Sequence, residues 1–287
     1  MSEQIILIAD SGSTKTDWVM VRASDGSRAE EAHTQGINPV HQQEEDIHRI
    51  LHDELMAQWP DTPQPTAVYF YGAGVTSVHT AMMQRLLKEV FPAAMAEVEN
   101  DMIGATRALC GRQEGIAAIL GTGANSCLYD GVNIVAHTPA LGYILGDEGS
   151  GAVLGIRFVN AIFKDPAFAA IRNEYLDSER LTMTDIIHRV YREPMANRFL
   201  ASTSLFIARH IDNPLIAALV VDNFRSFLCR NILPYGRQDL PVNCVGSMAY
   251  HYRPQLQEAA RCEGFTVGRI LKSPLDGLVD YHLADYR

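Results

Sequence analysis

Residues 4–18, QIILIADSGSTKTDW, decide the fold. An apolar run ends at Asp10, a turn of small and polar residues follows, and a second run rich in large apolar residues extends from Thr16 to Arg22. Short apolar runs separated by Gly and Ser are typical of β-strands joined by a turn. The sequence therefore predicts a β-hairpin that begins with a buried strand.

The same order of features begins again at residue 116. An apolar run at 116–120 ends in the turn Gly121-Thr122-Gly123, and strands are expected at 126–129 and 134–137. In the first half, the pattern predicts a strand at 29–34, a helix at 44–59, a strand at 67–71, a helix at 79–91 and a strand at 96–98. Both halves read as a βββαβα unit, and an approximate duplication explains this most simply. We predict an α/β fold with two such domains.

The boundary between the predicted domains is expected near residue 105, which gives domains at 1–104 and 105–273. A helical insertion is predicted at about 150–235. After it, the pattern predicts a strand at 242–245, a helix at 254–262, a strand at 265–271 and a final helix within 274–287. Two facing units of this kind create a cleft into which the turns at the strand ends project, and small-molecule sites favour such places.

Composition narrows the classes of function. The formal net charge is −10 and no basic cluster is present, which argues against a nucleic-acid partner. No apolar stretch approaches the ~18 residues of a membrane span, and the N-terminus lacks the basic segment of a signal peptide. The five cysteines are irregularly spaced, with no Cys-x-x-Cys pair. That spacing is typical of reduced thiols in a cytoplasmic protein.

The two glycine-containing turns are candidate phosphate sites. In the first, Asp10 at the strand end can hold a hydrated Mg²⁺. Backbone N–H groups and one cation are offered there by Gly12, Ser13, Thr14 and Lys15. The second turn, 121–123, places a hydroxyl between two glycines. Either turn alone can be a plain hairpin. Two at equivalent positions favour a nucleoside triphosphate, which needs donors from both walls of a cleft.

Three further motifs accompany these turns. Asn100-Asp101 stands at a strand-to-helix junction, where an N-cap is the simple interpretation and a general base is the functional one. Residues 141–151, LGYILGDEGSG, are unusually rich in glycine for an ordinary loop, and two carboxylates lie there just before a helix. Residues 242–249, VNCVGSMA, run from a strand into a small-residue turn. Such a turn suits either close approach to adenosine or tight strand–helix packing.

At these places the chain resembles the BadF/BadG-type ATPase family and, within it, the N-acetylglucosamine kinases. The stretch DSGSTKTDW at 10–18 is similar to the first phosphate motif of the family, LGTGANS at 120–126 to the second, and VGSMA at 245–249 to the adenosine motif. The stretch ALGYILGDEGSG at 140–151 resembles the most distinctive motif. The resemblance covers essentially the whole chain, in the same order.

The resemblance implies an actin-like fold of two ribonuclease-H-like domains, with ATP and Mg²⁺ in the interdomain cleft and the final helix packed on the first domain. By motif position, Asp101 would be the general base and Asp10 would bind Mg²⁺ through water. The residues implied in ATP binding are Asp10, Gly12, Ser13, Thr14, Lys15, Gly121, Thr122, Gly123, Gly246 and Ser247. Those implied in sugar binding are Asn38, Gly72, Ala73, Gly74, Asp101, Thr122, Gly142, Tyr143 and Asp147.

The implied activity is transfer of the γ-phosphoryl group of ATP to a hydroxyl, on C6, of an amino sugar. N-acetylglucosamine is the first choice, and glucosamine, N-acetylmannosamine and N-acetylmuramic acid stay open. Vertebrate-type enzymes carry Trp-Gly-His before the Gly-Asp-Glu-Gly-Ser run, whereas this chain has Leu141-Gly142-Tyr143, so part of the sugar pocket differs. The helical insertion is expected to support a homodimer or to form one edge of the cleft.

Rival functions stay open at this point. An ATPase that activates a partner enzyme through a shared iron–sulfur cluster would need thiolate ligands, and the scattered cysteines offer no obvious pair. A dinucleotide-binding oxidoreductase is suggested by Gly72-Ala73-Gly74, but the third glycine of that fingerprint falls at Ser77. A sugar or nucleotide sensor on the same fold is a third alternative. His48 and His52 share a helix face, without an obvious third metal ligand.

Overall fold

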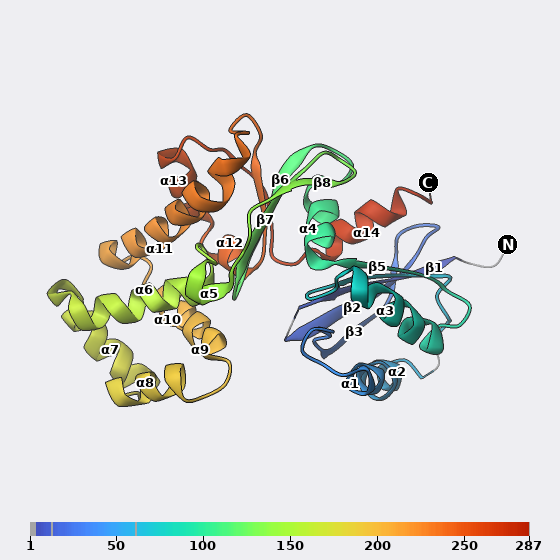
Figure 1. The fold of residues 1–287 in the computed structure, drawn as a ribbon, viewed down its shortest axis with the longest axis horizontal. Helices are drawn as coiled ribbons and strands as arrows, with labels where there is room; N and C mark the ends of the chain where they lie inside the picture. The colour runs from blue at the N-terminus through green and yellow to red at the C-terminus, as the bar shows by residue number, and fades with distance from the viewer. Residues whose placement is uncertain (1–3, 13, 61, 287) are drawn as a thin grey trace. The chain divides into compact units, whose positions relative to one another are not determined.

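The computed structural model describes residues 4–12, 14–60 and 62–286 and divides into two compact units (Figure 1). Unit 1 comprises Met1–Arg112 and Pro274–Arg287, and unit 2 comprises Gln113–Ser273. Each unit has a five-stranded mixed sheet and its own hydrophobic core. The prediction of a two-domain α/β fold is confirmed.

The sheet of unit 1 has the strand order β3-β2-β1-β4-β5. Its strands are β1 (Ile5–Ser11), β2 (Lys15–Arg22), β3 (Arg28–Gln35), β4 (Ala67–Gly72) and β5 (Met95–Asn100). The first three are antiparallel neighbours, whereas β4 runs parallel to both β1 and β5. The carboxyl ends of β1, β4 and β5 consequently meet at one edge of the sheet.

Helices cover both faces of this sheet (Figure 1). One face packs on α1 (Glu44–Arg49), η1 (Ile50–Leu55), α2 (Met56–Gln58) and α3 (Ser77–Val90). The other face carries α4 (Asp101–Cys110) and α14 (Leu275–Leu283), which pack on each other. Strand β4 serves both faces, because Val68 and Phe70 join the first core while Tyr69 and Tyr71 face α4 and α14. The last helix of the chain thus belongs to unit 1.

One predicted helix has an irregular middle. The spacing predicts a single helix at 44–59, and the structure has α1 and α2 separated by the π-helical η1. The apolar residues Ile47, Ile50, Leu51 and Leu55 are all fully buried. A π-turn inserts one residue into a helix without breaking it. The apolar stripe therefore survives, and its spacing does not reveal the insertion.

Unit 2 repeats the sheet of unit 1. Its strand order is β10-β9-β6-β7-β8, which read from β8 is the order of unit 1. The strands are β6 (Gly115–Leu120), β7 (Ala124–Tyr129), β8 (Ile134–His137), β9 (Val242–Val245) and β10 (Val267–Leu271). Strands β6, β7 and β8 are antiparallel neighbours, whereas β9 is parallel to β6 and β10. The shared order supports the duplication inferred from the sequence.

The helical insertion of unit 2 lies between β8 and β9. Its elements are α5 (Gly142–Leu145), α6 (Gly151–Lys164), η2 (Pro166–Phe168), α7 (Ala169–Glu179), α8 (Met183–Tyr191), α9 (Ala196–Ser202), α10 (Ser204–Arg209), α11 (Pro214–Phe227), η3 (Leu228–Ile232) and η4 (Leu233–Tyr235). Between β9 and β10 stand α12 (Ser247–His251) and α13 (Arg253–Cys262). Among the residues described, none of the helices has the length and apolar character to cross a membrane.

Candidate functional site

In unit 1, three strand ends bring candidate residues together. Ser11 at the end of β1 pairs with Gly72 at the end of β4, and Gly72 pairs with Asn100 at the end of β5. Asp10 therefore lies beside the turn that begins at Gly72, and Asp101 follows directly on the third strand. The parallel register of β1, β4 and β5 is what gathers these distant parts of the sequence.

Carboxylates are concentrated at this edge. Asp10 is the cross-strand neighbour of Asp17. Burial first, and then the negative charges of Asp17 and Asp101, raises the pKa of the Asp10 carboxyl from 3.8 to about 7, while Lys15 acts in the opposite direction. Carboxylates that repel each other in a half-buried place favour protons or a cation. Because Mg²⁺ in proteins prefers one or two carboxylates and retained waters, Asp10 is suited to hold it.

Asp17 is a site residue that sequence reasoning missed. It is only 8% exposed. Its Oδ2 lies 2.7 Å from Lys15 Nζ and its Oδ1 lies 2.7 Å from His33 Nδ1. The ammonium of Lys15, predicted to face phosphates, is thus paired with a neighbouring carboxylate. The signal was present, since residues two apart on a strand share a face and Asp17 is two residues after Lys15.

The start of α4 shows which residue of Asn100-Asp101 is the N-cap and which is left as the candidate general base. Asn100 is the N-cap residue, and its Oδ1 accepts a hydrogen bond of 2.8 Å from the backbone N–H of Ile103. Asp101 is the next residue, the first of the helix, and its charge acts on Asp10. Asn100 therefore caps the helix. Capping does not account for the presence of a carboxylate at position 101.

Ser11, which the sequence analysis did not select, fastens two loops to the first turn. Its Oγ accepts a hydrogen bond of 2.9 Å from Ile37 N–H and lies 3.0 Å from Ile37 O. The backbone oxygen of Ser11 accepts a hydrogen bond of 2.8 Å from the N–H of Ala73. A further hydrogen bond, of 3.1 Å, runs from the N–H of Gly36 to the backbone oxygen of Thr14 in the same turn. The predicted sugar segments at 38 and 72–74 are consequently tied to the predicted phosphate turn.

Asn38 and Gly74 are in direct contact. Asn38 is 8% exposed, and its Oδ1 accepts a hydrogen bond of 3.1 Å from Val40 N–H. Gly74 has φ +75°, and a Cβ added there would lie 2.1 Å from Asn38 Oδ1. Only glycine permits this approach. The β4–α3 turn therefore has the conformation needed to seat the amide side chain of Asn38.

At Gly12 and Gly121, the packing of the surrounding atoms would also accept a larger residue. Neither Gly12 nor Gly121 has a positive φ. A Cβ on Gly12 would meet only Lys15 O, at 3.8 Å, and one on Gly121 would have no described atom within 4 Å. An alanine would fit both places in the fold. The glycines therefore leave space on the outer side of each turn, as a ligand contacting the backbone requires. Ser13, also assigned to ATP, lies outside the described residues.

In unit 2, the turn 121–123 is anchored to the start of α6. The backbone oxygens of Gly121 and Thr122 accept hydrogen bonds of 2.8 and 3.1 Å from the N–H groups of Gly151 and Ala152. Ser150 caps α6 through its hydroxyl, which accepts from Val153 N–H. Thr122 is exposed at the tip of the turn. The helix that follows the glycine-rich segment thus fixes the second candidate phosphate turn.

Asp147 lies against the same turn. Its Oδ2 would be 3.0 Å from a Cβ on Gly123, so the glycine makes room for the carboxylate. Burial first, and then the charge of Glu148, raises its pKa to about 6, although the backbone N–H of Ala124 donates to it. Its φ of +55° is uncommon for a residue other than glycine. Such strain is found where the surrounding structure requires one side-chain position.

Gly142 and Tyr143 begin the short helix α5. Leu141, with φ +63°, and Gly142, with φ +72°, form a left-handed entry to it. Tyr143 is half-buried, whereas Ile144 and Leu145 are 77% and 75% exposed. This segment precedes Asp147 directly and is connected to it by the hydrogen bond from Asp147 N–H to Ala140 O.

The strand–helix turn at Gly246-Ser247 touches the second glycine turn. Gly246 has φ +119°, and a Cβ there would lie 2.4 Å from Leu120 O. Close packing by itself therefore demands glycine at 246, which is the plainer of the two interpretations of this motif. Ser247 is exposed at the first position of α12. Within unit 2 the structure thus brings together residues 121–123, 147 and 246–247.

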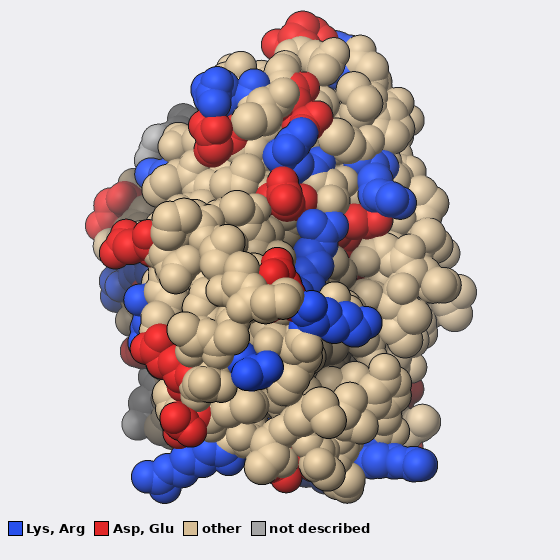
Figure 2. All heavy atoms as spheres, turned by 90° about the vertical axis from the view of Figure 1, so that its left-hand side faces the viewer, with Lys and Arg blue, Asp and Glu red and all other residues tan. Residues whose placement is uncertain are grey.

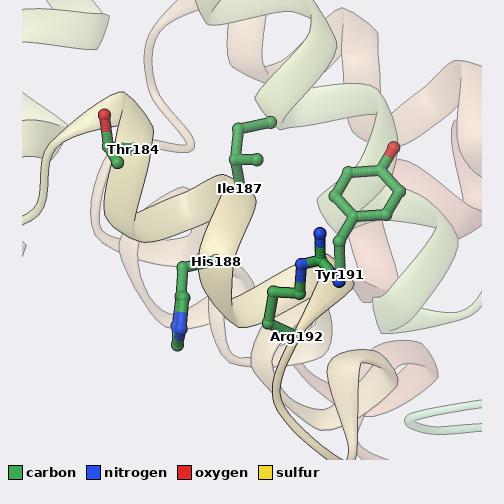
Figure 3. Close-up of a pocket in the computed structure, with 5 residues that line it drawn as sticks. All are labelled: Thr184, Ile187, His188, Tyr191 and Arg192. Atoms are coloured by element: carbon green, nitrogen blue, oxygen red, sulfur yellow. The ribbon is translucent and has the colours of Figure 1, made fainter.

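Two other features do not form a site. The hollow in Figure 3, of about 610 Å³, is lined by Thr184, Ile187, His188, Tyr191 and Arg192, all from α8 and its end. None of the candidate residues is among them. His48 and His52 stack with ring centroids 4.1 Å apart. The described residues contain no cluster of three or more His, Cys, Asp or Glu side chains arranged to hold a metal ion.

The face drawn in Figure 2 shows mixed charges. Lys and Arg side chains alternate there with Asp and Glu rather than gathering into a field of one sign. Nucleic-acid-binding surfaces are characterised by a basic stripe or patch. This face has no such stripe.

Comparisons with known proteins bear on the whole chain. The sequence matches no protein-family model and no curated protein. The structure superposes on that of a Porphyromonas gingivalis protein, provisionally named an N-acetylglucosamine kinase, with TM-score 0.92 and 46% identity over 98% of this chain and 100% of the other. A Chromobacterium violaceum protein with the same provisional name gives TM-score 0.69 and 20% identity over 98% and 99%. A ROK hexokinase from Thermus thermophilus gives TM-score 0.50 and 14% identity over 98% of each chain. At identities of 20% and 14%, the Chromobacterium violaceum and Thermus thermophilus structures show the fold alone.

Proposed function

This chain belongs to the N-acetylglucosamine kinase-like members of the BadF/BadG-type ATPase family, and we propose that it transfers the γ-phosphoryl group of ATP to the C6 hydroxyl of N-acetylglucosamine. The 46% identity over 98% of the chain supports the sugar-kinase activity. The single structural observation that supports the chemistry is the carboxylate of Asp101, which begins a helix next to Asp10 but leaves the capping to Asn100.

Asp101 is assigned the general base. A sugar hydroxyl must lose its proton as it attacks phosphorus, and a positioned carboxylate can accept that proton. The turns at Gly12 and Gly121 are assigned to the phosphates, because each leaves its outer side open without a packing reason. Asn38 and Asp147 are assigned to the sugar, since amide and carboxylate oxygens bind hydroxyls, and Gly74 is assigned with them because it makes room for the Asn38 side chain. Positioning and electrostatics supply most of the rate enhancement in phosphoryl transfer.

Mg²⁺ fits the residues present. The carboxyl of Asp10 has a raised pKa because it is buried near Asp17 and Asp101, and a divalent cation would relieve that repulsion. Asp10 would hold the ion through water, and Asp17 would keep Lys15 at the same turn. When bound, the ion neutralises charge on the transferring phosphoryl group.

The experiment that tests the function compares turnover of the purified wild-type protein and Asp101→Asn with ATP, Mg²⁺ and N-acetylglucosamine. General-base catalysis is typically worth ~10²- to 10⁴-fold, so Asp101→Asn is expected to lose at least 100-fold in kcat. ATP binding, measured by calorimetry, should survive. Near-normal turnover in Asp101→Asn contradicts the mechanism.

The substrate is tested by the same ATP-consumption assay. N-acetylglucosamine, glucosamine, N-acetylmannosamine and N-acetylmuramic acid are compared, with glucose as control. The highest kcat/KM is expected with N-acetylglucosamine, since the relative of 46% identity carries that provisional name. A higher value with another amino sugar revises the substrate but not the reaction, and no stimulation by any of them ends the sugar-kinase proposal.

A homodimer is part of the proposal. Exposed apolar side chains recur every four residues along α8, at Met183, Ile187 and Tyr191. Light scattering is expected to show a dimer for wild type and a monomer for Ile187→Glu. Val132→Glu, a change at an equally apolar exposed position in unit 2, is the control and should remain a dimer.

Cytoplasmic location is also proposed. The cysteines in the described residues are free thiols, and ATP is an intracellular substrate. Fractionation of expressing cells with a tagged chain tests this, and recovery outside the cytoplasmic fraction contradicts it.

A further inference from the structure

A buried tyrosine supports the helix that begins with Asp101. Tyr71, in β4, is 1% exposed. A Cβ added to Gly104 of α4 would lie 2.9 Å from Tyr71 Cβ and 3.0 Å from its ring. Helix α4 therefore packs on the tyrosine with no room for a side chain at Gly104, one turn after Asp101. In the sheet, Tyr71 is also the register partner of Asp10.

The hydroxyl of Tyr71 connects α4 to α14. Arg107 Nη1 of α4 donates to Tyr71 OH at 2.6 Å, and the same nitrogen pairs with Glu97 of β5. On the other side, Tyr71 OH lies 2.7 Å from Nε2 of His282 of α14. An arginine can only donate, so the proton of the tyrosine is left for His282. The hydrogen bonds therefore run in one direction: Arg107 donates to the hydroxyl of Tyr71, and that hydroxyl donates to Nε2 of His282.

His282 is suited to accept that proton. It is 2% exposed, and its ring stacks on Tyr69 with centroids 3.5 Å apart. Burial, with the positive charges of Arg107 and Arg112, lowers its pKa to about 3. The imidazole is therefore neutral at physiological pH, and an unprotonated Nε2 is an acceptor.

Helix α14 packs directly against α4. A Cβ on Gly277 would lie 2.4 Å from Ala108 O, so the two helices are in backbone contact. Arg112, just after α4, pairs with Asp285, just after α14. The helix that begins with Asp101 is thus enclosed between the ring of Tyr71 and the backbone of α14.

We propose that Tyr71 is a positioning residue for Asp101: its ring and its hydroxyl bonds to Arg107 and His282 fix α4, so that the carboxylate at the start of the helix is correctly placed for proton transfer. This rests on the proposed function of Asp101. The position of the carboxylate matters because a displacement of ~1 Å in a catalytic group can cost about 100-fold in rate.

The test is Tyr71→Phe, with Tyr69→Phe as the matched control. Both changes remove one tyrosine hydroxyl from the same face of β4, but the hydroxyl of Tyr69 bonds Tyr286 near the end of the chain and not α4. With ATP and N-acetylglucosamine, Tyr71→Phe is expected to lower kcat by about tenfold, since the ring still supports α4 while its anchoring bonds are lost. KM for ATP should change less than twofold, and Tyr69→Phe should keep wild-type kcat.

A second readout does not depend on turnover. Hydrogen exchange of the backbone amides of residues 101–110 is expected to be faster in Tyr71→Phe than in wild type, and unchanged in Tyr69→Phe. In Asp101→Asn, adding Tyr71→Phe should lower the residual kcat by less than twofold, because the group being positioned is already gone. If Tyr71→Phe does not fold, His282→Phe keeps a ring against Tyr69 and removes only the acceptor, and the same fall in kcat is expected.

Two failures are distinguishable. Wild-type kcat and wild-type exchange of α4 in Tyr71→Phe, with Asp101→Asn inactive, overturn the positioning role and leave the proposed function intact. An additive loss of kcat in the double variant also overturns it, because the two residues would then act independently. An active Asp101→Asn overturns the assignment of the base and the positioning role with it.

Discussion

Replacement of Asp10 by Asn should stabilise the protein at alkaline pH while abolishing its activity. The unfolded chain releases the proton of this carboxyl near its ordinary pKa of 3.8, whereas the folded chain holds it up to about pH 7. The folded state therefore binds more protons between these values. The stability that this proton confers is fully present below the lower pKa and is lost as pH rises through the window.

The magnitude follows from the two pKa values. Each tenfold change in proton affinity is worth ~1.4 kcal/mol, so an increase from 3.8 to about 7 corresponds to at most ~4 kcal/mol of destabilisation at pH 8. Asp10 is partly exposed, and solvent screening reduces this to ~1–3 kcal/mol. Asparagine has nearly the same shape and no charge. We expect Asp10→Asn to unfold several degrees above wild type at pH 8.

The assay is thermal unfolding of both proteins at pH 5 and pH 8 without divalent cations. The gain in Tm should be larger at pH 8 than at pH 5, because pH 5 lies in the lower part of the window between the two pKa values and most of the destabilisation of wild type develops above it. Asp25→Asn is the control, because Ser27 holds the pKa of that exposed carboxyl below its usual range, and it should show no gain at either pH. A Tm difference for Asp10→Asn that is absent, or the same at both pH values, refutes the reasoning.

Two further changes separate ligand contact from packing. Gly121→Ala should keep wild-type Tm and raise KM for ATP at least tenfold, because the fold has room for the methyl group but the phosphates approach there. Gly246→Ala should lower the free energy of unfolding by ~2–4 kcal/mol, because its Cβ would overlap Leu120 O at a positive φ; equal Tm in the two variants contradicts this. Ser11→Ala should raise KM for the sugar and cost ~1–3 kcal/mol, since the buried N–H of Ile37 loses its acceptor. Steady-state kinetics and denaturant titration check it, and an unchanged KM for the sugar would argue against the link to the Asn38 loop.

Short elements bounded by turn signals were predictable from the sequence alone. The strands at 134–137 and 242–245 have the predicted bounds, because turn-forming residues flank them: Asn133 precedes the first strand, and Pro241 and Gly246 enclose the second. The duplication was also visible, since both halves begin with a buried strand and a glycine turn. These features are local, and local patterns are sufficient for them.

The parts that were missed depend on long-range pairing. The contact of Tyr71 with His282 joins residues 211 positions apart, and a tyrosine in an apolar strand is otherwise read as a core residue. For Asp17 only the pairing with Lys15 is local, whereas its second partner, His33, is defined by the register of β2 and β3. The π-helical η1 keeps the apolar spacing of an ordinary helix, so periodicity has no means of detecting it.

The place of α14 has a consequence for synthesis of the chain. Residues 113–273 are contiguous and can close their core as soon as they leave the ribosome, whereas residues 1–112 must wait for a helix translated after all of them. Domains usually become complete in the order of translation, from the N-terminus onward. Here the order is reversed, and until the segment from 274 arrives one face of the N-terminal sheet is covered by α4 alone. A nascent chain stalled before that segment would contain all residues of unit 2. Unit 1, with the carboxylates of Asp10, Asp17 and Asp101, would still lack its last helix.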